Sequence, residues 1–280
     1  MRIVRVRRVL NRHKRRDEWF LDDYSVNPYT GCTFGCLYCY VRGGRYGSTE
    51  LKVKVNAAEV LRKEITRVER GIVALGTSTE PYMPCEREFE ITRDLLKVLA
   101  EHRFPVHLLT KSELVLRDAD LLLRLERSAI LPSDLRLPSR SFVTISFSTI
   151  DDELAEVIEP GAPPPSSRMR VVEKLSDLGI HVGAAFIPVI PFLSDSEEDI
   201  RRMILEARDR GARYVFVGAL TLPGSCKETF FGFLRRRFPE LLGRYEILYR
   251  GEYPPKWYDR RLEKIARDVC RSLRMKYRIA

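Results

Sequence analysis

Short apolar segments alternate with amphipathic segments along most of this 280-residue chain, and this alternation restricts its fold more than any other feature. The apolar segments read as buried strands; they are residues 24–27, 72–75, 106–109, 142–147, 182–187 and 214–217. The segments between them repeat apolar residues at helical spacing; they are 56–68, 91–100, 114–125, 168–178 and 194–211. Such alternation favours a parallel α/β sheet with helical crossovers. Six strand–helix units predict either an open doubly wound sheet or a partial barrel.

Local sequence also predicts where three of the helices begin. Asn56 to Glu59 form a capping-box pattern ahead of the first long helix. Ser194 and Asp195 precede the helix that ends near residue 211. Ser166 or Ser167, after a proline-rich stretch, is the candidate cap of the helix around residue 170.

Three segments are expected along the chain. Residues 1–19 form a basic N-terminal arm, which either follows a phosphate backbone or lies as a strand and loop over the bottom of the barrel. Residues 20–224 carry the strand–helix units. Residues 225–280 form a helical C-terminal extension packed on the core, with a last helix from about Tyr258 to Leu273.

Arginine dominates the charge. The 49 basic residues comprise 38 Arg and 11 Lys, and the net charge is +10. This balance suits a polyanionic partner such as a nucleic acid. An arginine-rich surface that carries ion pairs, as in heat-adapted organisms, accounts for it as well.

Nothing in the sequence indicates export or a membrane. Residues 1–24 have no uninterrupted apolar core of a signal peptide, and no segment approaches the roughly 18–20 apolar residues of a membrane span. We therefore expect a cytoplasmic protein without a membrane partner. In that compartment the six cysteines stay reduced and more often bind metal or perform chemistry than form disulfides.

Three cysteines, Cys32, Cys36 and Cys39, lie in one loop directly after the first predicted strand. Thiolates at this spacing bind zinc or an iron–sulfur cluster. A structural zinc site needs a fourth ligand, usually from a second pair, whereas the other three cysteines stand far apart. Three ligands on a cubane cluster leave one iron open, and this favours a functional cluster over a saturated one.

Four further segments follow the second to fifth predicted strands; the first three are polar, and the last is apolar and bounded by prolines. They are GTSTEPY (76–82), TKS (110–112), SFST (146–149) and PVIP (188–191). Because the carboxyl ends of parallel strands meet at one edge of a sheet or barrel, these segments and the cysteine loop are expected to form one site.

The C-x3-C-x2-C pattern, with the aromatic Tyr38 just before its last cysteine, resembles the radical S-adenosylmethionine (SAM) enzymes. Further segments resemble the branch that includes spore photoproduct lyase and its "DNA repair photolyase" relatives. These segments are NPYTGCTFGCLYCYVR, GTSTEPYMPCE, LLTKS, ISFSTID, EPGAPPPSSR and PVIPFLSD. The similarity runs from about Asp22 to Gly224, which is most of the chain.

This resemblance implies a partial (β/α)6 TIM-type barrel with a [4Fe–4S] cluster and SAM as cofactors. In the family, an electron from the reduced cluster cleaves SAM, and the resulting 5′-deoxyadenosyl radical abstracts a hydrogen atom from the substrate. The cofactor supplies the chemistry, and the protein positions it. An electron donor such as a ferredoxin or flavodoxin is therefore an expected partner.

The resemblance also implies roles for single residues. Cys32, Cys36 and Cys39 match the cluster ligands, Tyr38 the aromatic near the adenine, and Tyr40 a tyrosine beside the radical path. The implied SAM contacts are Thr77, Ser78, Thr79 and Glu80 for the amino group, Lys111 and Arg168 for the carboxylate and ribose, Ser146 or Ser148 for the ribose hydroxyls, and Pro188 for the adenine. Hydroxyls and carboxylates suit an ammonium, and basic side chains suit a carboxylate.

One position departs from spore photoproduct lyase. That enzyme carries a hydrogen-donor cysteine at the end of its second strand, where this sequence has Gly76. Cys85 follows nine residues later, between two prolines and a helix, and we expect it at the rim of the pocket rather than in the donor's place.

The leading hypothesis is a lyase-like radical SAM enzyme that acts on an unknown substrate, with nucleic acid as one candidate. Two alternatives stay open. One is DNA repair of the spore photoproduct lyase type with a relocated cysteine. The other is a non-catalytic iron–sulfur or zinc protein that binds nucleic acid.

Overall fold

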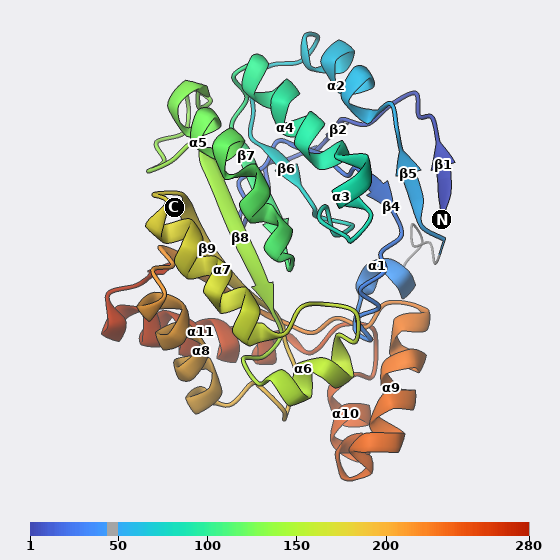
Figure 1. Ribbon diagram of the computed structural model, residues 1–280. Helices are drawn as coiled ribbons and strands as arrows, with labels where there is room; N and C mark the ends of the chain where they lie inside the picture. The colour runs from blue at the N-terminus through green and yellow to red at the C-terminus, as the bar shows by residue number, and fades with distance from the viewer. Residues whose placement is uncertain (44–49, 280) are drawn as a thin grey trace.

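The computed structural model describes residues 1–43 and 50–279 of the chain (Figure 1). Within these residues, eight strands form one sheet in the order β11-β10-β9-β8-β7-β6-β3-β2. Their bounds are β2 Asn11–Arg12, β3 Tyr24–Val26, β6 Val73–Leu75, β7 Val106–Thr110, β8 Ser141–Phe147, β9 His181–Val189, β10 Tyr214–Ala219 and β11 Lys276–Tyr277. All neighbours pair in parallel except β2, which is antiparallel to β3.

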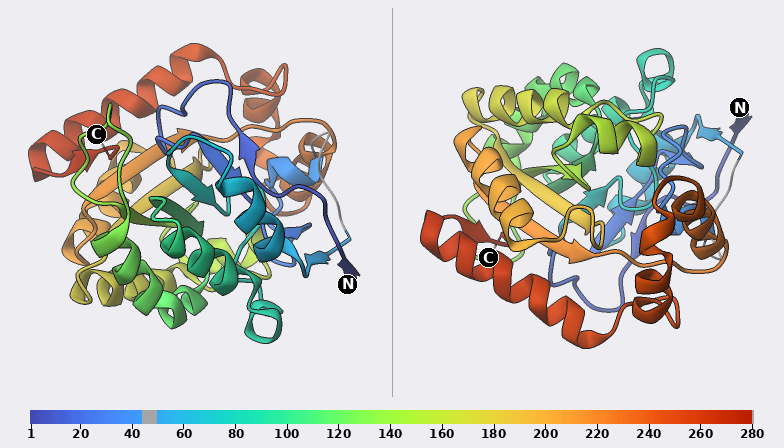
Figure 2. Two further views of the ribbon diagram at one scale, coloured as in Figure 1. Left: turned by 90° about the horizontal axis from the view of Figure 1, so that it is seen from above. Right: turned by 90° about the horizontal axis from the view of Figure 1, so that it is seen from below.

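The strand order decides between the two predicted architectures. The six central strands, β3 and β6 to β10, stand in the order in which they occur along the chain. Right-handed crossovers between strands in sequential order place every helix on one face, so the sheet curls into a barrel instead of a doubly wound layer. The predicted α/β fold, a partial (β/α)6 barrel, is confirmed, and Figure 2 shows the helices around the outside of the strands.

The helices connect these strands in turn. Their bounds are α1 Tyr40–Gly43, α2 Ala57–Ile65, α3 Glu86–Phe89, α4 Ile91–Glu101, η1 Glu113–Asp118, α5 Ala119–Ser128, α6 Asp152–Ile158, α7 Pro165–Asp177, α8 Glu197–Asp209, α9 Ser225–Arg237, η2 Pro239–Leu241, α10 Leu242–Leu248 and α11 Lys256–Leu273. The buried face of α4 carries Leu95, Leu96 and Leu99, as its helical spacing predicts.

The predicted helix caps are wrong in three places, although α2 begins where the sequence predicts. Asn56 stands before α2, but its side chain bonds to both backbone groups of Val6 instead of capping the helix. Helix α8 begins at Glu197 with Ser196 as its cap. Helix α7 begins at Pro165, because proline is favoured in a first helical turn, and no serine side chain caps it.

Aromatic side chains fill the barrel interior near the beginnings of its strands. Phe142 and Tyr214 are fully buried there. The segment 17–21, between β2 and β3, joins them: Trp19 stacks on Phe216 of β10 with ring centroids 5.9 Å apart. His107 of β7 lies 3.0 Å from the carbonyl oxygen of Phe20 through Nδ1. The segment 17–21 therefore contacts the interior faces of β7 and β10 and forms a floor beneath the upper part of the barrel.

Both ends of the chain pair with other segments. The strand β1 (Arg2–Val4) pairs in parallel with β5 (Lys52–Lys54), which also pairs with β4 (Tyr29–Thr30). Residues 1–19 thus contain two short strands, β1 and β2, joined and followed by loops. At the other end, β11 extends the main sheet beside β10, and α9 lies beside α1 (Figure 1). The division of the chain after residues 19 and 224 stays a prediction.

None of the helices in the described ranges has the length and apolar character that crossing a bilayer requires.

Candidate active site

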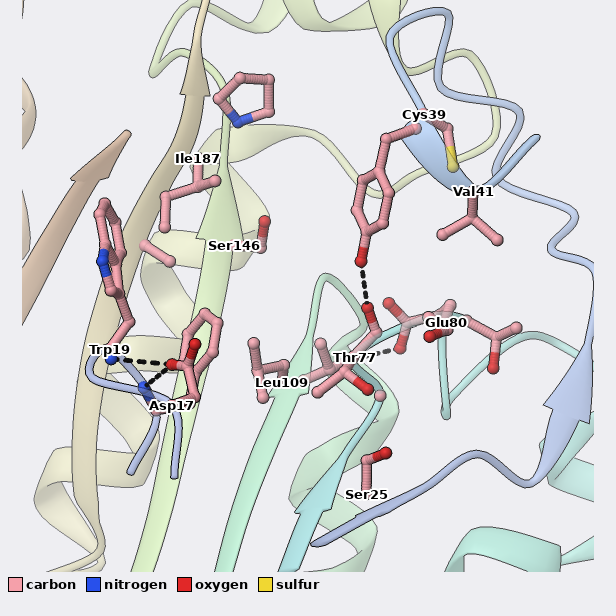
Figure 3. Close-up of a pocket in the computed structure, with 18 of the residues that line it drawn as sticks. Asp17, Trp19, Ser25, Cys39, Val41, Thr77, Glu80, Leu109, Ser146 and Ile187 are labelled. Carbon is pink, nitrogen blue, oxygen red and sulfur yellow. Dashed lines mark hydrogen bonds between the residues drawn. The ribbon is translucent and has the colours of Figure 1, made fainter. Parts of the chain in front are cut away.

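A pocket of about 890 Å³ opens at the carboxyl ends of the strands. Figure 3 shows side chains from several strands converging on it, with Cys39 at one side and Ser25, Asp17 and Trp19 at the other. Its lining includes residues from the cysteine loop and from the four other strand-end segments predicted to meet there: Cys32, Cys36, Tyr38, Cys39, Tyr40, Gly76, Thr77, Ser78, Thr79, Glu80, Thr110, Lys111, Ser146 and Pro188. The predicted convergence is therefore present in the structure.

The cysteine loop is fixed on the barrel by backbone hydrogen bonds. The amide of Leu37 donates to the carbonyl of Ile158 at 2.9 Å, and the amide of Gly161 donates to the carbonyl of Phe34 at 2.9 Å. Gly35 adopts a positive φ of 66°, a conformation that glycine takes without steric cost. These contacts tie the loop to the end of α6 and direct its thiols toward the pocket.

The three loop thiols fit an iron–sulfur cluster. All three are free and line the same pocket. Burial, together with the neighbouring Glu159 carboxylate, raises the pKa of Cys36 to about 12, and burial also raises the pKa of Cys32. Thiols that resist ionisation in the free protein become thiolates when a metal compensates their charge. Among the described residues no three such donors form a group for a single ion; a cluster does not require one, since each thiolate binds a different iron.

The second strand end is organised by Glu80. Its buried carboxylate accepts hydrogen bonds from the Thr110 hydroxyl, the Lys111 amide at 2.9 Å and the Tyr82 amide at 3.0 Å. Burial raises the pKa of Glu80, and these donors act in the opposite direction. Glu80 therefore joins the ends of β6 and β7 and leaves the hydroxyls of Thr77 and Ser78 at the pocket surface.

Glu159 is the central residue that the sequence analysis did not identify. Its carboxylate, 1% exposed, accepts hydrogen bonds from Tyr38 and Arg168, and from the Ser148 hydroxyl at 2.9 Å. Lys111 Nζ lies 3.6 Å away. Burial alone would raise the pKa of Glu159, but the positive charges of Lys111 and Arg168 outweigh it and lower the pKa to about 2. The carboxylate is thus ionised and connects four of the predicted site residues.

Some residues of this hydrogen-bond network line the pocket, and others lie behind the pocket wall. Ser146 lines the pocket, and its hydroxyl accepts a hydrogen bond from Lys111 Nζ at 2.7 Å. Ser148 and Arg168 lie outside the set of described lining residues, and Arg168 donates to the carbonyl of Ser146 at 2.8 Å. The direct SAM contacts expected of these residues stay predictions.

Tyr40 lies beside the cluster loop at the mouth of the pocket. The residue is 52% exposed, and its hydroxyl donates to the carbonyl of Thr77 at 2.6 Å. The tyrosine therefore bridges the cysteine loop and the end of β6.

Gly76 stands where a side chain does not fit. Its φ is +89°, and an added Cβ would lie 2.3 Å from the carbonyl oxygen of Leu109 and 2.8 Å from the Pro81 ring. A cysteine in this position would require the backbone to move. Cys85 precedes α3 and lies outside the set of described residues that line the pocket.

Comparison with known proteins agrees with this geometry. The family described as the radical SAM superfamily matches residues 26–204, and the chain belongs to this superfamily. The uncharacterized protein Rv2578c of Mycobacterium tuberculosis is 34% identical over 270 residues, which cover 92% of this chain and 75% of that protein. A radical SAM Nα-GlyT isomerase of Pseudomonas phage M6 is 24% identical over 78% of this chain and 44% of its own length.

Solved structures support the fold. Spore photoproduct lyase in complex with dinucleoside spore photoproduct superposes with a TM-score of 0.70 at 16% identity, over 95% of this chain and 78% of the lyase. SuiB of Streptococcus suis, bound to its precursor peptide SuiA, gives a TM-score of 0.58 at 15% identity, over 91% of this chain and 47% of SuiB. The shared fold is that of radical SAM enzymes, and such enzymes in general use SAM and a [4Fe–4S] cluster.

Proposed function

We propose that this protein binds a [4Fe–4S] cluster through Cys32, Cys36 and Cys39 and SAM in the adjoining pocket, and that it abstracts a hydrogen atom from a nucleic-acid substrate. The observation that carries the proposal is the convergence of three thiols with polar groups from three further strand ends on one pocket. When bound and reduced, the cluster supplies the electron that cleaves SAM to methionine and a 5′-deoxyadenosyl radical. We expect this electron to come from a ferredoxin or flavodoxin.

The chain's own residues have separate tasks in this proposal. The hydroxyls of Thr77, Ser78 and Thr79 accept hydrogen bonds from the SAM ammonium, and Lys111 faces its carboxylate. Glu80 does not contact the SAM ammonium directly in this proposal, because its oxygens already accept three hydrogen bonds from neighbouring residues. It positions the ends of β6 and β7 instead.

The ribose and adenine are assigned to the opposite wall of the pocket. We assign the ribose contact to Ser146 instead of Ser148, since Ser146 lines the pocket and Ser148 is bonded to Glu159. We assign Tyr38 and Pro188 to the walls of the adenine site. Arg168 positions the Ser146 backbone from behind the wall.

A nucleic-acid substrate is supported by charge and by similarity. Arg15 and Arg16 are among the residues that line the pocket, in a chain of net charge +10. A neighbouring second pocket of about 670 Å³ is lined by Arg12, Lys14 and Arg15, among others. Such side chains bind phosphates through charge and counterion release. Spore photoproduct lyase, which has the same fold, is complexed with a dinucleoside.

Repair of the spore photoproduct type is the second candidate, and Gly76 disfavours it. The backbone at residue 76 leaves no space for the family's donor cysteine. We therefore propose a different final reaction on the radical formed in the substrate.

Anaerobic reconstitution tests the proposal. We expect about four irons per chain in one cluster, and formation of 5′-deoxyadenosine when the reconstituted protein is reduced with SAM present. The Cys36→Ala variant should lose both. Cys226 is the matched control, because its Sγ lies only 3.9 Å from the Leu37 carbonyl of the cluster loop. If the Cys226→Ala variant loses iron as completely as Cys36→Ala, the ligand assignment is wrong; a colourless protein that binds one zinc ion would favour the non-catalytic alternative.

A further inference from the structure

A serine, a histidine and an aspartate form a chain at the far end of the pocket from the cysteines. Ser25, in the middle of β3, lines the pocket with its side chain (Figure 3). Its Oγ lies 3.1 Å from Nε2 of His13. Nδ1 of His13 lies 3.2 Å from Oδ2 of Asp22. None of the three belongs to the cluster or SAM contacts described above.

The chemistry of the three groups fixes the direction of this chain. A carboxylate only accepts hydrogen bonds, so the proton of a neutral His13 belongs on Nδ1, which faces Asp22. Nε2 then presents its lone pair to the Ser25 hydroxyl. In this order of groups an imidazole can act as a base toward a hydroxyl while a carboxylate lies beside its other nitrogen; here the Nδ1–Oδ2 contact is close but does not have the geometry of a hydrogen bond.

Asp22 is the unusual member. Its side chain is 2% exposed, and within the described residues neither of its oxygens has a hydrogen-bond partner. Buried carboxylates are normally hydrogen-bonded, so the close contact with His13 is the interaction that the structure offers it. Burial raises the pKa of Asp22 to about 6, while His13 acts in the opposite direction.

Within residues 1–43 and 50–279, the surroundings supply no stronger partner for Asp22 or for His13. Asp17 and Asp23 both act on Asp22 as like charges. The Oδ1 atom of Asp17 accepts from the Trp19 and Phe20 amides, and Asp23 is paired with Arg16, which also contacts Asp134. On its other side, His13 shares the second pocket with the charged side chains of Arg12, Lys14, Arg15, Glu69 and Arg70.

His13 also lies between the two pockets. It lines the main pocket, it lines the second pocket beside Arg12 and Arg15, and its side chain is 29% exposed. A proton that reaches His13 from the buried Ser25 therefore has an exit to solvent.

We propose that Ser25 is a catalytic acid–base residue and that His13 and Asp22 relay its proton between the pocket and solvent. In the forward direction, an N–H or O–H group of the substrate gives its proton to Ser25 Oγ, while the Ser25 proton passes to His13 Nε2. The imidazolium is stabilised by Asp22 and then releases one proton to solvent. Hydrogen-atom abstraction moves a proton and an electron together, so a substrate whose charge changes during turnover needs such a separate proton route. The catalytic role of Ser25 rests on the proposed function. The activation of Ser25 by His13 and Asp22 in the resting protein does not.

The state of the relay can be tested on the resting protein, without reductant or SAM. A fluorophosphonate forms a Ser Oγ–P bond and loses fluoride when a base removes the hydroxyl proton. We expect peptide mapping to find the label on Ser25. The His13→Gln variant should react about 100-fold more slowly, the usual contribution of a general base, and Asp22→Asn should also slow the reaction. Matched controls are His102→Gln, a half-buried residue at the C-terminal end of α4, and Ser133→Ala, in the second pocket; both should label at the wild-type rate.

The pH dependence of the wild-type protein provides a test that needs no variant to fold. Labelling should fall as the pH drops below about 6, the raised pKa of Asp22, because the Asp22 carboxylate then becomes protonated. Labelling of Ser25 that is independent of both pH and His13 would overturn the proposal, as would the absence of label on Ser25. Neither result would bear on cluster binding or on SAM cleavage, which are measured separately.

Discussion

Glu159 and Arg168 form an ion pair in which each side chain is 1% exposed. Two ions buried this deeply are stable only when their remaining hydrogen-bonding groups are satisfied. Here Tyr38 and Ser148 donate to the carboxylate, and the carbonyls of Pro163 and Ser146 accept from the guanidinium. The pair therefore joins the cluster loop to the ends of β8 and α6.

Removal of one partner should be costly. We expect Glu159→Ala to destabilise the protein by about 3–5 kcal/mol, because Arg168 and Lys111 would be left without their buried counter-ion. Urea unfolding measures this change. The control is Glu156→Ala on the exposed face of α6, where a surface substitution changes the stability by less than about 0.5 kcal/mol. Equal effects at residues 156 and 159 would contradict a structural role for the pair.

Because of the same ion pair, part of the unfolding free energy depends on pH. The pKa of Glu159 is lowered from 4.5 to about 2 in the folded protein, so the stabilisation is fully present above pH 4.5 and is lost as the pH falls through about 2. The difference in unfolding free energy between wild type and Glu159→Gln should therefore shrink over this interval. A constant difference from pH 5 to pH 2 would show that Glu159 is not ionised in the native state.

Gly76 should resist substitution. A Cβ there would meet the Leu109 carbonyl at 2.3 Å in a backbone with φ of +89°. Gly179 is a matched control, since its φ is +79° and nothing lies within 4 Å of an added Cβ. Gly179→Ala should cost about 1 kcal/mol of backbone strain, and Gly76→Ala clearly more in urea unfolding. If Gly76→Cys folds normally and converts spore photoproduct, the case against that substrate is lost.

Cys85 should be dispensable for radical formation. It lies at the N-terminal end of α3, outside the described lining of the pocket. The Cys85→Ala variant should therefore form 5′-deoxyadenosine at a near wild-type rate and turn over the true substrate normally. The informative measurement is the ratio of 5′-deoxyadenosine to product. Normal cleavage of SAM combined with stalled or damaged product would show that Cys85 has taken the role of hydrogen donor.

Nucleic-acid binding should depend on the basic residues of the second pocket. Affinity for DNA should fall with salt, with a slope of about 0.9 per phosphate contact in a double-logarithmic plot. Arg12→Ala combined with Arg15→Ala should reduce that slope by about 1–2. Arg201→Ala combined with Arg202→Ala, on the exposed face of α8, changes the net charge equally and should leave the slope unchanged. Equal effects of the two pairs would indicate that only the net charge matters, and absence of binding at low salt would exclude this partner.

The sequence predicted the main architecture because the long strands carry their own signal. The apolar runs at 142–147 and 182–187 correspond to β8 and β9 within two residues at each end. The strands β2, β4 and β11 are only two residues long, too short for any periodicity. They are defined by their partners in the sheet, which single-sequence patterns do not contain.

Helix caps were less predictable, because polar side chains find partners far away in the chain. Ser194 resembles a cap, but its hydroxyl donates to the carbonyl of Ser148. Asp195 accepts hydrogen bonds from the amide of Phe192 and the hydroxyl of Tyr258. Their neighbour Ser196 caps α8 instead.

The candidate site was predicted where motif and strand end coincide, and missed elsewhere. The cysteines and the polar segments were identified because each follows a strand. Glu159 follows a helix, and its partners come from residues 38, 111, 148 and 168. Only the folded barrel brings them together. The EPGAPPP segment that begins with Glu159 was the available signal, although no spacing rule pointed to its carboxylate.

The stacking of Trp19 on Phe216 has a consequence for how the protein is made. The two rings are separated by 197 residues of chain, the difference between positions 216 and 19. At a synthesis rate of about 5–20 residues per second, the first ring waits roughly 10–40 seconds on the ribosome before its partner is translated. Contacts of such long range form late in folding. The segment 17–21 is thus among the first to leave the ribosome and among the last to find its place, and until then the aromatic interior of the barrel is exposed to other chains.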